Sequence, residues 1–199
     1  MTRGARTGSS RRHGLRVAPA IARAERRAAE RFREQVRHQA GWWPADDAMT
    51  LLAWDADGGV AGCLDVGRAR GGTFAMEERG VRVPGWIPRR TTGEVTRWAA
   101  RPRQGLAVQV SLAEAAALWM RDEGLTHAIG LLTGEGRRRL ERAALPMSPL
   151  APPRSVLAGG RRLPLHPMWT PIPDLARWSA ACRRRAAAVD GLEDLFNLA

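Results

Sequence analysis

The stretch THAIGLL, residues 126–132, begins with two polar residues and continues with the apolar run AIGLL, which has the length of a strand. Such a run is typical of a strand buried on both faces, which requires further layers packed above and below the sheet. The strand pattern GEVTRWAA and the helical pattern LAEAAALWMRDEG come before it, and a second helical pattern, GEGRRRLERAAL, follows it. This alternation of strands and helices predicts an α/β domain.

The chain before this core is expected to supply a helix and a hairpin. From Pro19 to about Gln39, apolar residues recur at helical spacing, which predicts an amphipathic helix that Gly41 ends. The apolar positions of this helix are Ile21, Ala28, Phe32 and Val36. MTLLAW and VAGCLDV, joined by DADGG, are expected to pair because glycine supplies the positive φ of a tight turn.

The other connections carry recognisable turn and cap signals. Residues 67–92 are rich in Gly, Arg, Pro and Thr without a sustained period, which predicts a long excursion over the surface. Ser111 and Glu114 fit a capping box at the start of a helix, and Gly124 fits its C-cap. A last hairpin is expected around Gly159 and Gly160, where prolines restrict it to the edge of the sheet.

Three segments are predicted along the chain. Residues 1–16 have little to bury and are expected to form a flexible basic arm, residues 17–173 one domain, and residues 174–199 a terminal helix and tail. No apolar run is long enough for a membrane span. Cys63 and Cys182 lie far apart without a secretory signal, so we expect a protein of the reducing cytoplasm.

Charge restricts the possible partners and chemistries. The 32 basic residues are all arginine, which excludes Schiff-base, pyridoxal phosphate and P-loop lysine chemistry. A net charge of +12 favours an acidic partner, whether nucleic acid, an anionic membrane surface or an acidic protein. Nucleic acid is the less favoured of these, because the basic N-terminal segment lacks interleaved aromatic residues and no helix-turn-helix or zinc motif is visible.

Common catalytic motifs are missing from the sequence. The four histidines are scattered without a second ligand at helical spacing, so no metal site is predicted. The sequence contains no G-x-S-x-G elbow and no G-x-G-x-x-G after a strand, which argues against a serine nucleophile and a dinucleotide site. We therefore predict no bound cofactor.

The segment GEVTRWAA, residues 93–100, is the strongest candidate for a reactive site. If the segment is helical, Glu94 and Arg97 form an ordinary surface ion pair worth a few tenths of a kcal/mol. If it is a strand, Glu94, Thr96 and Trp98 share one face, and a bulge could turn Arg97 toward the same cleft. A carboxylate in that cleft could serve as a general base.

Five strings in order resemble the acyl-homoserine lactone synthase family, small bacterial enzymes with the GNAT acetyltransferase type of fold. They are HQAGWW, PADD, MTLLAWDADGGVAGCLDV, GEVTRWAA and GLTHAIGLLT. The corresponding family strings are a helix ending near ELGW, acidic residues, TYLLARDDDGRVVGCVRL, WELSRFAV and GITHLVGVT. The resemblance covers roughly residues 20–172 and implies a GNAT-like acyltransferase fold, with a central mixed twisted sheet flanked by helices.

The resemblance also implies an activity. In that family an acyl group passes from acyl carrier protein to the amino group of S-adenosylmethionine, and the product closes to an N-acyl-homoserine lactone quorum-sensing signal. An acidic carrier protein would suit a basic surface, although coenzyme A remains possible as the acyl donor. Two alternatives are a GNAT-type N-acyltransferase with another amine acceptor and, in a different class, a basic nucleic-acid-binding protein.

Several residues take roles from the resemblance. Glu94 matches the glutamate proposed as base for the attacking amine, with a structural carboxylate held by Arg97 as the alternative. Arg97 matches an arginine that could orient Glu94 or bind an anionic group of the substrate. Trp42 matches a tryptophan that could close over the sulfonium, and Asp46 and Asp47 lie near acidic positions that could hold the ammonium or ribose of the substrate.

Further matches concern the edges of the site. Thr133 follows the last string, where the family lines its acyl-chain tunnel, and Thr96 and Trp98 are expected to contact substrate. The N-terminal family arginine can be placed on Arg31 or Arg33, of which we favour Arg31.

Three positions depart from the family. They are Val36 near the end of the first helix, Asp65 where the family has an arginine, and Gly93 where the family has a tryptophan. The inverted charge at Asp65 suggests that substrate contacts have moved, for example to Arg68 or Arg70, or that the substrates differ.

Overall fold

One large mixed sheet organises the molecule in a computed structural model, which describes residues 10–12, 15–36, 48–101, 105–158 and 161–188. Its strands are β1 (Ser10–Arg12), β2 (Leu15–Pro19), β3 (Met49–Trp54), β4 (Val60–Arg68), β5 (Thr92–Ala100), β6 (His127–Thr133), β7 (Ser148–Pro149), β8 (Arg154–Ala158) and β9 (Arg161–Pro171). Their spatial order is β1-β2-β3-β4-β5-β6-β9-β7, and β8 also pairs with β9. The β5–β6 pair is parallel and the other pairs are antiparallel.

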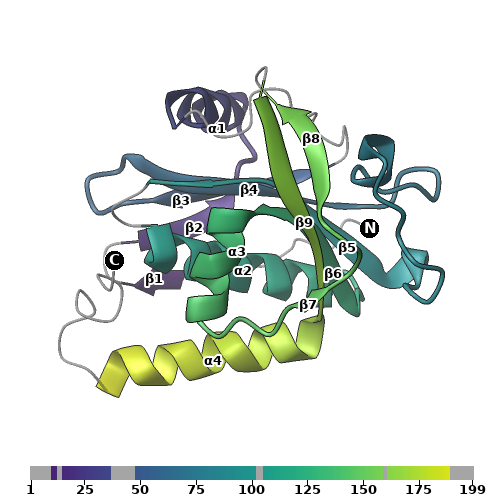
Figure 1. Cartoon of the computed structure of the whole chain (residues 1–199). Helices are drawn as coiled ribbons and strands as arrows, with labels where there is room; N and C mark the ends of the chain where they lie inside the picture. Colours follow the sequence, from purple (N-terminus) through teal and green to yellow (C-terminus); the bar gives the residue numbers. More distant parts are fainter. Residues whose placement is uncertain (1–9, 13–14, 37–47, 102–104, 159–160, 189–199) are drawn as a thin grey trace, which may run out of the picture.

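Helices cover both faces of this sheet (Figure 1). They are α1 (Arg23–Gln35), α2 (Gly105–Asp122), α3 (Gly134–Arg142) and α4 (Ile172–Ala188), with short 3-10 turns η1 (Glu77–Arg79) and η2 (Arg89–Thr91). Helix α1 lies on one side of the sheet, and α2 and α4 lie on the other (Figure 1). The predicted α/β fold, a mixed sheet flanked by helices, is confirmed.

Alternating side chains of the central strands feed two separate apolar layers. On the α1 side, Phe32 packs with Leu52, Cys63 and Ala99. On the other side, α2 contributes residues spaced four apart to a cluster with Leu51, Leu64 and Val66, namely Val108, Leu112, Ala116 and Met120. Each fully buried leucine contributes about 1.5–3 kcal/mol to folding, so these layers hold both helices on the sheet.

Helix α2 begins earlier than its capping signal predicts. Ser111 and Glu114 lie inside the helix rather than at its start, because the spacing of Val108 and Leu112 continues the buried stripe one turn upstream. The predicted C-cap at Gly124 is confirmed: it has a φ of 70°. Its N–H donates to Arg121 O, and the next N–H donates back to the preceding helical turn, which is the Schellman arrangement.

The N-terminal prediction needs two corrections. Part of the segment expected to be a flexible arm forms strands, because β2 pairs with β3 from Arg16 to Pro19 and Val17 is buried. The first helix is shorter than predicted: it begins at Arg23, so Ile21 lies before it and is 75% exposed.

The excursion between β4 and β5 also differs from its prediction. It was expected to run over the surface, yet Phe74, Met76, Val81, Val83 and Ile87 are buried in an apolar cluster with side chains of β6 and β9. Because these residues follow no period of two or 3.6, a sequence pattern cannot reveal that they form a core of their own.

The C-terminal hairpin, its place at the end of the sheet and the terminal helix are confirmed. Within the hairpin, β9 pairs with β6 along one side and with β8 and then β7 along the other, so the strand that carries the prolines lies one position in from the edge. Helix α4 then packs against α2. No helix in the described ranges is both long enough and apolar enough to cross a membrane.

Candidate active site

Strands β5 and β6 diverge in the middle of the sheet. Their parallel pairing runs from Thr92 and His127 to Val95 and Gly130 and then stops. Beyond these residues β5 continues with β4, and β6 continues with β9. The result is a fork, in which the facing edges of two central strands are open to a ligand.

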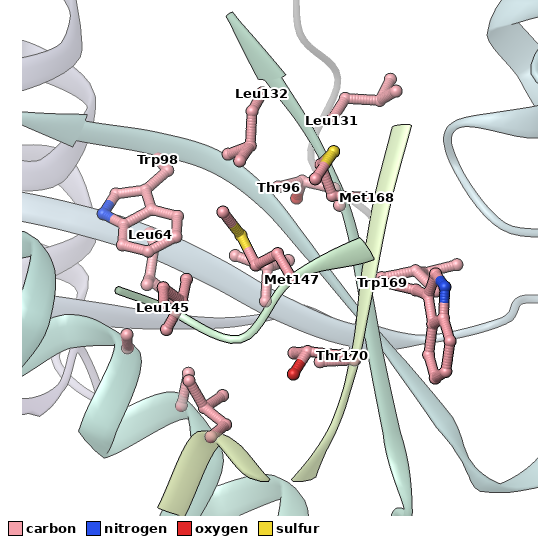
Figure 2. Close-up of a pocket in the computed structure, with 17 residues that line it drawn as sticks. Leu64, Thr96, Trp98, Leu131, Leu132, Leu145, Met147, Met168, Trp169 and Thr170 are labelled. Atoms are coloured by element: carbon pink, nitrogen blue, oxygen red, sulfur yellow. The ribbon is translucent and has the colours of Figure 1, made fainter. Parts of the chain in front are cut away.

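An apolar pocket occupies this fork (Figure 2). Residues of strands β4, β5, β6 and β9, of helices α2 and α4 and of the segment after α3 line it, among them Leu64, Thr96, Trp98, Leu131, Leu132, Leu145, Met147, Met168, Trp169 and Thr170. Figure 2 shows the side chain of Met147 between Trp98 and Thr170. A mostly apolar lining with a few hydroxyl groups suits a hydrocarbon chain better than a charged ligand.

Glu94 lies on β5 just before the fork opens and is only 5% exposed. Its carboxylate accepts hydrogen bonds from two backbone N–H groups of the β4–β5 excursion, Ala75 at 2.6 Å and Met76 at 2.8 Å. The structure therefore excludes the helical alternative for this segment, in which Glu94 would form a surface pair with Arg97. Instead, the carboxylate ties the excursion to the central sheet.

The surroundings of Glu94 raise its pKa to about 7. Burial is the main cause, since it disfavours the charged carboxylate, and the two backbone N–H groups oppose it. The nearby charges of Glu77 and Glu78 raise the pKa further. A carboxyl group that titrates near neutral pH has the proton affinity expected of a general base.

A second glutamate, Glu77, holds the excursion through contacts within it. Glu77 pairs with Arg89, whose Nη2 donates to Oε1 at 2.6 Å, and it accepts the N–H of Phe74 at 3.0 Å. These contacts lower the pKa of Glu77 to about 2, the bond from Arg89 being the largest cause. The two carboxylates thus fix one loop while their own proton affinities shift in opposite directions.

A β-bulge on β5 turns Arg97 toward helix α1. Thr96 pairs with Asp65 and Ala99 pairs with Cys63, so two residues of β5 lie opposite one residue of β4. Arg97 has a φ of 48°, a left-handed conformation that costs a non-glycine residue about 1–3 kcal/mol. The predicted bulge is therefore present, but it directs Arg97 to partners other than Glu94.

The partners of Arg97 form a ring of alternating charge, which we call the charge ring: Glu30 and Arg33 of α1, Asp65 of β4 and Arg97 of β5. Arg97 Nε donates to Asp65 Oδ2, and its Nη1 donates to Glu30 Oε1 at 2.8 Å. Arg33 Nη2 donates to Asp65 Oδ1 at 2.7 Å, and its Nη1 donates to Glu30 Oε1 at 3.0 Å. The ring joins α1 to two strands.

Two predictions for this region are corrected by the charge ring. Arg33, not Arg31, belongs to the charge ring, because Phe32 and Arg33 face the sheet while Arg31 lies on the exposed side of α1. Arg97 does not orient Glu94, since its guanidinium is bound to Asp65 and Glu30. The inverted charge of Asp65, noted above from the sequence, is the signal that could have placed these arginines, because a carboxylate at a core position between apolar neighbours requires buried cations beside it.

Other predicted residues lie in different surroundings. Thr96 and Trp98 line the pocket. Arg68 lies outside the pocket, half-exposed, and pairs with Glu123 at 3.1 Å. Thr133 caps helix α3 by accepting the N–H of Gly136 at 3.1 Å, beside the lining residue Leu132 but not in the lining itself.

Trp42, Asp46 and Asp47 lie outside the described residues. At Gly93 there is no room for the tryptophan of the resembled family, because an added Cβ would lie 2.9 Å from Met120 Cε and 3.0 Å from Leu125 Cδ1. Within the described ranges, no group of three His, Cys, Asp or Glu side chains could hold a metal ion.

The sheet order, the parallel central pair and the fork define the GNAT class of acyltransferase folds, and solved structures bear this out. FeeM, an N-acyl amino acid synthase from uncultured soil microbes, matches 81% of this chain and 92% of its own, with a TM-score of 0.65 and 13% identity. TofI in an apo form matches 81% and 95%, with a TM-score of 0.59 and 20% identity. The AHL synthase LasI matches 79% and 89%, with a TM-score of 0.56 and 14% identity.

Other matches are N-acetyltransferases, among them a putative acetyltransferase from Salmonella typhimurium with its cofactor acetyl-CoA. A second TofI structure is a ternary complex with an inhibitor and MTA. No family model and no curated protein sequence matches the chain. The chain thus has a GNAT-type fold in a divergent sequence, and the fold predicted from the sequence is confirmed.

Proposed function

We propose that the protein is an N-acyltransferase that moves an acyl group from a thioester to an amine. One observation carries this proposal. On β5, Glu94 is a buried carboxyl group with a pKa near neutrality, and it lies next to the strand edge where the apolar fork opens. The apolar pocket would hold the acyl chain, and the facing strand edges offer backbone groups to the amides of a thioester carrier.

The reaction requires a neutral amine. In the proposed step the amine lone pair attacks the carbonyl carbon of the thioester, a C–N bond forms, the C–S bond breaks, and the thiol leaves. The amine loses one proton, which Glu94 accepts directly or through a water, and the leaving thiolate takes up one proton. A carboxylate with a pKa of about 7 can accept that proton and release it again at neutral pH.

The donor and acceptor come from the resemblance and from the charge of the chain. An acyl carrier protein is acidic and would be attracted to a chain with a net charge of +12, whereas acyl-coenzyme A would need only the fork. The resemblance favours S-adenosylmethionine as the acceptor and an N-acyl-homoserine lactone as the product. The fold is equally compatible with another amine acceptor.

Thiol release tests the proposal. The purified chain is mixed with acyl-coenzyme A or acyl carrier protein loaded with chains of several lengths, and with a panel of amines that includes S-adenosylmethionine. Formation of amide with any donor and acceptor supports N-acyl transfer, and release of methylthioadenosine supports the lactone-forming version. A complete lack of thiol release across the panel would contradict the proposal.

Glu94→Gln tests the base within the same assay. We expect a loss of about 10²–10⁴-fold in kcat, the range typical of a lost general base, with the circular dichroism of the fold retained. Glu135→Gln is the matched control, because Glu135 is an exposed glutamate on α3. Equal turnover of Glu94→Gln and the wild type would contradict the role of Glu94 as a base, and Glu94 would then serve only to bind the β4–β5 excursion.

A further inference from the structure

The two buried arginines of the charge ring are already occupied by carboxylates of this chain. Asp65 is fully buried, and it accepts hydrogen bonds from Arg33, from Arg97 and from Thr50 Oγ1 at 2.7 Å. Glu30 accepts from both arginines as well, with Arg97 Nη1 reaching its second oxygen at 3.1 Å. Two cations and two anions leave the ring with no net charge.

This pairing limits what the charge ring can bind. A carboxylate on an incoming substrate could reach Arg33 or Arg97 only by displacing Glu30 or Asp65. Displacing Asp65 would leave a fully buried anion without its partners, which is among the costliest changes in a protein interior. Glu30 is half-exposed at 52%, but it belongs to the same helix as Arg33 and is held by both guanidinium groups.

The charges near Glu94 also disfavour an acceptor that carries a carboxylate. Glu94 is buried close to Glu77 and Glu78, and both of these carboxylates oppose additional negative charge there. Arg89, one of the arginines of the β4–β5 excursion, is bound to Glu77 through both of its Nη groups. An acceptor with a carboxylate beside its amine would bring a further anion toward this group of glutamates, whereas a simple amine would bring only a positive charge.

We propose that the acceptor is an amine with no carboxylate beside the reacting nitrogen, such as a linear diamine or a decarboxylated amino acid. This inference rests on the proposed N-acyltransferase function and specifies its substrate class. It selects the second of the two acceptor types considered above, and it gives Asp65 a definite role. By pairing with Arg33 and Arg97, Asp65 removes these two guanidinium groups as an anchor for an amino acid carboxylate.

Matched pairs of acceptors test the proposal. Cadaverine is compared with lysine, and decarboxylated S-adenosylmethionine with S-adenosylmethionine, using one acyl-thioester donor and thiol release as the readout. We expect kcat/KM to be at least about tenfold higher for the decarboxylated member of each pair, a ratio that corresponds to roughly 1.4 kcal/mol. Equal or higher kcat/KM for the carboxylated members would overturn the inference while leaving N-acyl transfer established. Lack of turnover with every acceptor would overturn both.

Variants of the charge ring provide a second measurement. Asp65→Asn leaves the two arginines with one unit of net positive charge, so we expect the preference to shift about tenfold toward the carboxylated member of each pair. Glu30→Gln makes the same change in charge at the half-exposed position and serves if Asp65→Asn does not fold. Glu135→Gln, an exposed glutamate on α3, is the control. An unchanged preference in a folded ring variant would overturn the inference.

Discussion

Replacing Glu94 with glutamine should remove a specific pH dependence of stability. The pKa of Glu94 is raised from about 4.5 to about 7 in the folded protein. Between these values the folded chain keeps a proton that the unfolded chain releases, so the free energy of unfolding falls as the pH rises through this window. The full difference corresponds to about 3 kcal/mol, at 1.36 kcal/mol for each pH unit. Glutamine does not titrate, so Glu94→Gln should lack this slope.

Urea unfolding of both proteins at several pH values between 5 and 7.5 measures the effect. His166, whose pKa is lowered by burial and by Arg137, contributes a slope of the opposite sign. That contribution is common to both proteins and cancels in the difference. Glu77 contributes only at lower pH, where stability is lost as the pH falls from about 4.5 toward 2. Parallel pH profiles for the wild type and Glu94→Gln would refute the assignment of a raised pKa to Glu94.

Three further substitutions have defined outcomes. Asp65→Ala leaves two buried arginines without their shared carboxylate and should lower the free energy of unfolding by about 3–5 kcal/mol. Urea unfolding measures this loss, and a loss below about 1 kcal/mol would contradict the charge ring. Gly62→Ala would place a Cβ 2.4 Å from Val108 Cγ1 and 2.9 Å from Ala99 O, so thermal unfolding should show a loss of about 1–3 kcal/mol. Met147→Ala enlarges the fork pocket and should shift the preferred acyl thioester to a longer chain; an unchanged optimum would show that the acyl group binds elsewhere.

Much of the fold could be predicted because its elements carry local signals. The MTLLAW and VAGCLDV hairpin, the THAIGLL strand and the helix after it follow from turn residues and apolar spacing alone. The excursion of residues 67–92 could not be predicted in this way. Its buried residues pack against strands that come later in the chain, so tertiary contacts rather than any local period determine their burial.

The candidate site was predictable in part. The strand alternative for GEVTRWAA is confirmed, and Glu94 is a buried residue of that strand. The partner of Arg97 could not be read from the sequence, because a bulge of one residue decides which way the guanidinium points. The choice between Arg31 and Arg33 depended on a helical register shifted by two positions, in a helix where arginines occur on several faces.

The charge ring also limits which single substitutions at Asp65 the folded protein can tolerate. Exchanging Asp65 for the arginine found there in the resembled family would gather three guanidinium groups around the carboxylate of Glu30. Like charges in a buried cluster repel strongly, so a chain with only this exchange would be poorly stable. Because the resembled family has an arginine matching Arg97 as well as the arginine at position 65, an exchange of Asp65 is expected to be accompanied by a new acidic residue that pairs with these cations. The position of that carboxylate, more than the invariance of any one arginine, would mark the proteins that share the present arrangement.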